Sequence, residues 1–348
     1  MKISRLFRLF LISIISIASA RTAAACDLCG CYTPQLETNA SSNEPFASFW
    51  MTGLYGAVSE QFTHFATEQV DGNEVDNTTG QRLESSITQL VAGYSFNSWF
   101  SLQTNVPLIY RYFKRPEGFA IDRGTVSGLG DISLLAKFVL FHKESPGRRE
   151  FVPDGKSPTF IDHDPDFTAS AALLLGAKFP TGDSSRLKEE FNEVEVPGAP
   201  ESGIHGHDLT LGTGSYDGIF GGQTALRYKN TFFEANLQFT LRGDGLHQYH
   251  FANDLSWSGG PGYYFMHRHD KVLGLQFVIS GEYKDVDRFQ GRPAEDTGIT
   301  SVFLGPRLVA SLGRFSGELG ADFPVSIRNT ALQVVPTYRV RAGFAVRF

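Results

Sequence analysis

Cysteine, long apolar runs and basic charge are all scarce in this sequence. The 348 residues include 3 cysteines, and beyond residue 20 no segment continues for 18 residues without a polar or charged interruption. This pattern excludes an inner-membrane helix, and a hydrophobic content of 41% is too low for a helical membrane protein. A net charge of −6 argues against nucleic acid as a partner. No Ser-His-Asp order, phosphate loop or paired-carboxylate motif stands out, so we expect no enzyme.

The first 25 residues have the pattern of a secretory signal peptide. Three basic residues precede an apolar stretch over 9–20, and small residues suited to cleavage come before Arg21 and before Cys26. No Pro-rich or Gly-rich linker divides the remainder into two cores. We therefore predict a signal peptide over 1–25, a cysteine-bearing periplasmic segment over 26–46 and an outer-membrane β-barrel over 47–348.

The last strand-like run alternates with a period of two. Read backward from the end, every second residue is compatible with lipid, namely Phe348, Val346, Phe344, Ala342, Val340 and Tyr338. The residues between them include three arginines, which a barrel would direct into its interior. This pattern predicts an all-β protein, a membrane β-barrel of about 12 antiparallel strands closed by the C-terminal strand that ends in Phe348. Its expected partners are outer-membrane lipid, the barrel-assembly machinery acting through the C-terminal strand, and a small-molecule solute.

The same alternation recurs along the chain and predicts twelve strands, an even number that leaves both termini in the periplasm. We place them near 47–62, 82–96, 99–113, 128–142, 167–180, 207–229, 231–243, 248–265, 272–284, 299–312, 314–327 and 332–348. Tight turns are expected at 97–98, 229–230 and 313, and long polar loops at 63–81, 114–127, 181–206 and 285–298. The charged, Pro-containing segment 143–166 is the exception, because it is long and falls on the side of the tight turns. It indicates either an unusual loop or an error in the strand count.

The phase of the strands directs twelve polar side chains inward. They are Lys137, Lys178, Arg227, Glu234, Gln238, Arg242, Glu282, Arg307, Glu318, Asp322, Arg339 and Arg341. Charges of both signs can line a water-filled pore, or they can pair and plug a narrow barrel. The first alternative predicts a channel for small solutes, and the second a closed structural barrel.

Two groups of residues could bind a metal. Cys26, Cys29 and Cys31 lie close together at the start of the expected mature chain, and three thiols cannot all pair within one molecule. Clustered thiolates suit a soft metal, although the cluster lacks a fourth cysteine for a closed zinc site. An incidental cluster and lipidation of Cys26 are the alternative interpretations, although Ala23 stands where a lipoprotein signal would usually carry leucine. His205 and His207 share a face if extended, as do His267 and His269, but no third ligand is identifiable. A metal-binding or redox-linked envelope protein is therefore the rival to a channel.

Several motifs resemble the bacterial outer-membrane transporter-like family of phenol-degradation meta-pathway proteins. They are Ser127-Gly128-Leu129-Gly130-Asp131, Lys178-Phe179-Pro180-Thr181-Gly182-Asp183, the run from His207 to Ser215, and Phe303-Leu304-Gly305-Pro306. The resemblance implies an outer-membrane barrel that passes or binds small solutes, aromatic or hydrophobic compounds among them. It carries over no catalytic residues. Turn chemistry alone explains the Gly-Asp pairs as rim turns.

Overall fold

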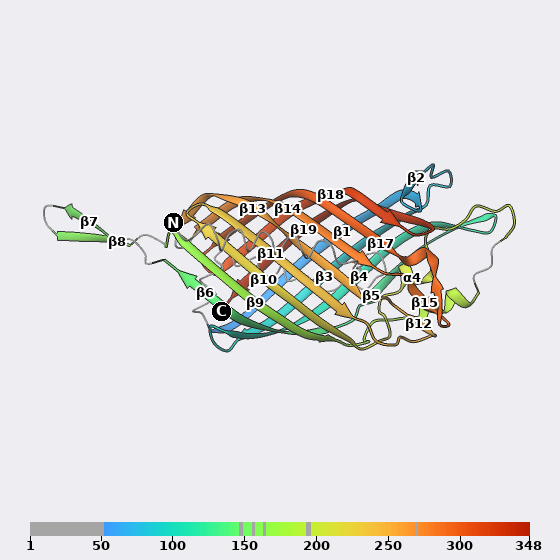
Figure 1. Ribbon diagram of the computed structural model, residues 1–348, viewed down its shortest axis with the longest axis horizontal. Helices are drawn as coiled ribbons and strands as arrows, with labels where there is room; N and C mark the ends of the chain where they lie inside the picture. The colour runs from blue at the N-terminus through green and yellow to red at the C-terminus, as the bar shows by residue number, and fades with distance from the viewer. Residues whose placement is uncertain (1–51, 146–148, 155–156, 163–164, 193–195, 269–270) are drawn as a thin grey trace, which may run out of the picture.

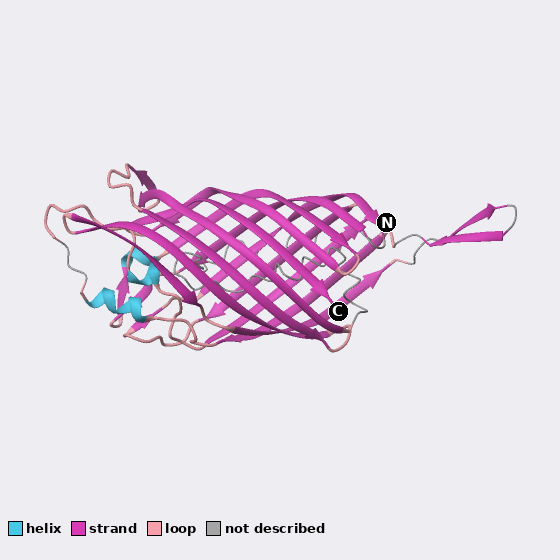
Figure 2. Cartoon of the chain, turned by 180° about the vertical axis from the view of Figure 1, so that it is seen from behind, coloured by secondary structure: helices cyan, strands magenta, loops and turns pink. Residues whose placement is uncertain are grey.

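The chain folds into a closed barrel of twelve antiparallel strands (Figures 1 and 2). The computed structural model describes residues 52–145, 149–154, 157–162, 165–192, 196–268 and 271–348. The barrel strands are β1 (Gly53–Val70), β3 (Arg82–Ser95), β4 (Phe100–Glu117), β6 (Ser133–Glu144), β9 (Phe167–Lys178), β10 (Asp217–Tyr228), β11 (Thr231–Leu241), β13 (Asp254–Arg268), β14 (Lys271–Lys284), β17 (Ile299–Leu312), β18 (Phe315–Asn329) and β19 (Leu332–Arg347). Strand β19 pairs with β1, with Tyr55 opposite Arg347, and this pairing closes the sheet. The predicted fold class is confirmed.

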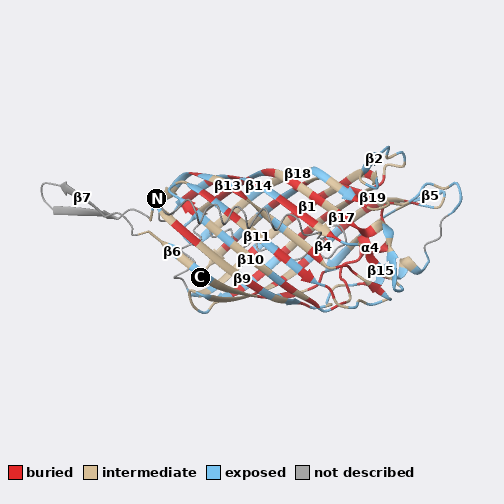
Figure 3. Ribbon diagram, in the orientation of Figure 1, coloured by how far each residue is buried: buried red, intermediate tan, exposed pale blue. Residues whose placement is uncertain are grey.

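Buried and exposed residues alternate along the barrel strands (Figure 3). The exposed positions are largely apolar and many of the buried ones are polar, so the barrel has an apolar exterior and a polar interior. On β11, Phe233 and Leu237 are exposed on the outer surface, while their neighbours Glu234 and Gln238 are buried inside. A closed barrel satisfies every backbone group between strands, so its outer face can meet lipid without unpaired N–H and C=O groups. Among the described residues, no helix is long and apolar enough to cross a membrane.

The two ends of the barrel differ in their connections. At the end that carries Phe348, strands join through tight turns near 97–98, 229–230 and 313, as predicted, with Lys229 and Gly313 in the left-handed region at φ 53° and 56°. Segment 143–166 also lies at this end, where it forms the hairpin of β7 (Arg149–Asp154) and β8 (Ser157–Asp162). It is therefore an unusual loop, and the strand count is right.

The opposite end, which we call the loop end, carries the long connections (Figure 1). They include β2 (Asn73–Val75), β12 (Tyr249–His250), β15 (Asp287–Phe289), β16 (Arg292–Ala294) and the 3₁₀ turn η2 (Glu295–Thr297). Three sequence predictions were wrong here. Strand β1 continues to Val70, through the first part of the loop expected over 63–81. Segment 114–127, expected to be a loop, continues β4 and returns as strand β5 (Ala120–Leu129). The strand expected over 207–229 begins only at Asp217, because residues before it turn into the barrel.

Candidate functional site: the barrel interior and its mouth segment

The loop end of the barrel is filled by residues 202–216, here called the mouth segment. It contains the short helix α4 (Gly206–Leu209) and packs beside the 3₁₀ helix η1 (Ser185–Phe191). Ile204 and Leu209 are 1% and 0% exposed. Their apolar cluster includes inward-facing residues of five barrel strands, namely Phe65, Leu83, Phe113, Ile299 and Val334. The mouth segment therefore lies in the barrel interior, where it contacts the inner faces of β1, β3, β4, β17 and β19.

A buried network at Lys178 joins the mouth segment to the wall. The Lys178 ammonium lies 2.9 Å from Asp131 Oδ2 and 2.7 Å from Asp217 Oδ2, and it donates to Thr213 Oγ1 at 2.9 Å. Asp131 accepts from the backbone N–H of Thr213 at 2.8 Å and of Gly182 at 2.9 Å. Three motifs that are far apart in sequence, around Asp131, Lys178 and Thr213, thus meet at one point. They do more than form separate rim turns, because together they fix the mouth segment.

Arg111 anchors the mouth segment from the other side. Its guanidinium projects inward from β4 and donates to the backbone carbonyls of Asp208 at 2.7 Å and Thr210 at 2.8 Å. The arginine is 1% exposed. A charged donor to two carbonyls, one in the last turn of α4 and one at its C-cap, holds the backbone there in one position.

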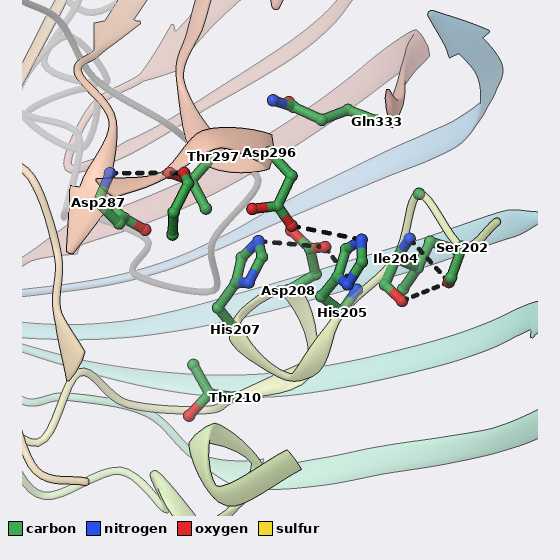
Figure 4. Close-up of polar contacts among 12 residues, drawn as sticks. Ser202, Ile204, His205, His207, Asp208, Thr210, Asp287, Asp296, Thr297 and Gln333 are labelled. Carbon is green, nitrogen blue, oxygen red and sulfur yellow. Dashed lines mark hydrogen bonds and ion pairs between the residues drawn. The ribbon is translucent and has the colours of Figure 1, made fainter. Parts of the chain in front are cut away.

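His205 and His207 lie in the mouth segment, where carboxylates surround them (Figure 4). Their rings stack with centroids 5.6 Å apart. His205 Nε2 lies 3.3 Å from Asp296 Oδ2, and His207 Nδ1 lies 3.0 Å from Glu190 Oε1. Burial alone would lower the pKa of His207, but the carboxylates of Asp208 and Glu190 outweigh it and hold that pKa well above 6.5. Burial likewise opposes ionisation of Glu190, yet the charge of His207 lowers its pKa to about 2.

These shifts predict how pH affects the mouth segment. The His207 contribution is complete below its ordinary pKa and is lost as pH rises through the raised value, whereas the Glu190 contribution is lost only as pH falls toward about 2. We therefore expect trypsin cleavage after Arg186 or Lys188 to increase under alkaline conditions. His207→Gln should be cleaved readily at all pH values tested, while His247→Gln, in the loop between β11 and β13, should behave as the wild type. Equal cleavage of wild type and His207→Gln across the series would contradict the assignment.

The interior carries further ion pairs between strands. Arg307 lies 3.0 Å from Glu234 and 3.4 Å from Glu318, Arg339 lies 3.5 Å from Glu282, and Arg341 pairs with Asp322. Arg242 pairs with Asp217 at 2.9 Å and with Asp254 at the loop end. Ten of the twelve side chains predicted to face inward are buried, and Lys137 and Glu318 are partly buried.

Of the other four predicted side chains, Lys178 belongs to the buried network described above. Arg227 donates to the Lys229 carbonyl at 3.2 Å. Gln238 is 4% exposed on β11, and Lys137 lies on β6 toward the Phe348 end.

The described residues provide no set of ligands for the metal sites predicted from the sequence. Cys26, Cys29, Cys31 and His269 lie outside the described residues, and in the part of the chain that is described no group of three or more His, Cys, Asp or Glu side chains has the arrangement of a metal site. His267 packs against the ring of Tyr264, with centroids 5.3 Å apart.

Sequence reasoning missed several residues that the structure brings into this site. Arg111 has the inward phase of its strand and was detectable from that phase alone. Asp131 was recognised only as part of a turn motif. Asp217 and Thr213 fell in a segment expected to be a strand, so their contacts with Lys178 had no sequence signal.

Solved structures with a similar fold are outer-membrane barrels. The chain is 11% identical to an outer membrane channel from Pseudomonas putida F1, with 86% of this chain and 96% of that chain covered and a TM-score of 0.52. It is also 11% identical to the β domain of the Bordetella autotransporter BrkA, with coverage of 86% and 100% and a TM-score of 0.41. No protein family model matches the sequence, and no curated protein matches it. At such identities the likeness concerns the fold alone.

The closed barrel and its apolar exterior place this protein in the bacterial outer membrane. Side chains such as Leu237 and Phe323, which are 50% and 55% exposed, meet lipid there without loss of hydrophobic free energy.

Proposed function

We propose that the protein is an outer-membrane channel for small solutes, with the mouth segment as its constriction at the external end. The observation that carries this proposal is an interior lined by oppositely charged side chains on many strands, in place of the apolar filling of a small structural barrel. Polar interiors of this kind accompany water-filled barrels. The solved outer membrane channel from Pseudomonas putida F1 has the same fold, which supports the proposal. We also propose, from the motif resemblance, that aromatic or hydrophobic compounds are among the solutes and that the function is not enzymatic.

Planar-bilayer recording tests the proposal directly. Wild-type protein should give reproducible conductance steps. The double variant Arg339→Gln, Arg341→Gln should shift the ion preference toward cations, because Glu282 and Asp322 then face the interior without their arginines. The matched double variant Arg288→Gln, Arg292→Gln removes two exposed arginines at the loop end and should keep the wild-type preference. A silent wild-type barrel would refute the channel, whereas the same selectivity in both variants would refute the role of Arg339 and Arg341 in ion preference.

A further inference from the structure

Two cationic side chains face the interior near the Phe348 end, away from the ion pairs described above. Lys137 on β6 continues the inward phase of Ser133 and Leu135, which are 0% and 1% exposed. Arg347 on β19 continues the inward phase of Arg341 and Ala345. Strands β4, β3 and β1 separate β6 from β19 around the wall, and both side chains project into the interior near this end of the barrel.

Neutral polar groups line the wall between these two cations. Ser101 is the register partner of Lys137, and Tyr55 is that of Arg347. The Tyr55 hydroxyl donates to Gln103 Oε1 at 3.2 Å. Its ring lies over Gly93, where an added Cβ would come within 2.2 Å of it. Glycine at this position therefore lets the tyrosine lie flat against the wall between the cations.

No carboxylate in the described part of the chain pairs with Lys137 or Arg347. The Tyr55 side chain links their surroundings along the wall, because it starts beside Arg347 on β1 and its hydroxyl reaches Gln103 on β4. Gln103 lies two residues from Ser101, the register partner of Lys137. Elsewhere in the interior, Arg307, Arg339 and Arg341 each face an acidic partner. Positive charge is therefore offset by an acidic side chain at each of those pairs, whereas no acidic side chain of the described residues pairs with Lys137 or Arg347. Two partly buried cations without a counter-charge are costly unless an anion joins them.

We propose that Lys137 and Arg347 form an anion-binding site for a small organic carboxylate on the interior wall. The planar guanidinium of Arg347 can donate two parallel hydrogen bonds to a carboxylate, and the Lys137 ammonium adds a point charge from β6. Basic side chains around a passage favour anions. The site rests on the proposed channel function in one respect only, namely that the bound carboxylate is a solute passing through the barrel.

Binding is measured on the purified full chain in detergent by isothermal titration calorimetry, with benzoate as the probe and benzylamine as its cationic counterpart. Wild type should bind benzoate and not benzylamine. The variant Lys137→Gln, Arg347→Gln should bind benzoate about tenfold more weakly or worse, because two charge-assisted contacts are lost. The control Lys143→Gln, Arg314→Gln removes two exposed cations at the same end and should bind as the wild type does. Heat-modifiable mobility on gels confirms that each variant is folded, and Arg347→Lys, which keeps the charge but loses the planar fork, should give intermediate affinity.

Reversal potentials across a KCl gradient separate this site from the channel itself. An anion preference that disappears in Lys137→Gln, Arg347→Gln but persists in the control supports both proposals. Benzoate binding that depends on Lys137 and Arg347 in a barrel without conductance would support the site and refute the channel. Conductance without benzoate binding, or binding that is equal in the variant and the control, would refute the site.

Discussion

Replacing Lys178 with methionine is expected to lower the free energy of unfolding by about 3–5 kcal/mol. The lysine side chain is 0% exposed and contacts Asp131 at 2.9 Å and Asp217 at 2.7 Å, so its removal leaves carboxylates buried with one cation fewer. Arg242 still faces Asp217, and Asp131 therefore loses the most. Denaturant unfolding of the refolded barrel in detergent measures the change.

Two further variants make the test of Lys178 specific. Adding Asp131→Asn to Lys178→Met removes the orphaned charge and should restore part of the lost stability. The recovery should be incomplete, because the Gly182 and Thr213 N–H groups donate to different oxygens of Asp131 and the amide keeps only one acceptor. Lys143→Met, at an exposed position, should change stability by less than about 0.5 kcal/mol. A loss below about 1 kcal/mol in Lys178→Met would show that the buried network does not hold the loop end.

The strands were predictable because lipid outside and polar groups inside impose a period of two. That rule holds only where the two faces meet different solvents. At the loop end, β4 and β5 extend beyond the part of the barrel that has an apolar outer face. Charged residues such as Lys114 and Arg123, which face each other in this hairpin, break the alternation, so the sequence did not predict it. The opposite error occurred in the mouth segment, where a strand was predicted and none is present between residues 202 and 216. Its Leu209 and Leu211 alternate like a strand, yet both are buried inside the barrel, at 0% and 4% exposure.

The inward phase of a side chain was readable from sequence, whereas its partner was not. Phase places Arg307 in the interior, but its carboxylate partner Glu234 lies 73 positions away on β11. Such a pairing depends on the register and tilt of strands that are not neighbours in the sheet. The same holds for the network at Lys178, since Thr213 reaches it only because the mouth segment folds back into the barrel. The residue types were visible in the sequence, and their juxtaposition was not.

Replacing Arg111 with methionine should release the mouth segment while leaving the barrel folded. Each hydrogen bond from a charged donor contributes about 1.5–3 kcal/mol, and Arg111 makes one to Asp208 and one to Thr210. A local loss of about 3 kcal/mol corresponds to a roughly hundredfold rise in the open population, and trypsin cleavage after Arg186 or Lys188 should accelerate by about that factor. If the mouth segment is the constriction, single-channel conductance should rise in the same variant. Arg123→Met, at an exposed position on β5, should change neither quantity.

Arg111→Lys separates the charge of Arg111 from its geometry. Both carbonyls accept from the same nitrogen, Nη1 of Arg111, and a lysine ammonium keeps the charge but lies on a shorter side chain without the fixed planar donors of the guanidinium. This variant should therefore fall between wild type and Arg111→Met in both assays. Rapid cleavage with unchanged conductance would mean that the mouth segment moves freely but does not limit passage. The constriction would then lie deeper in the barrel, among the ion pairs of Arg307, Arg339 and Arg341. Slow cleavage in Arg111→Met would instead show that the network at Lys178 holds the segment by itself.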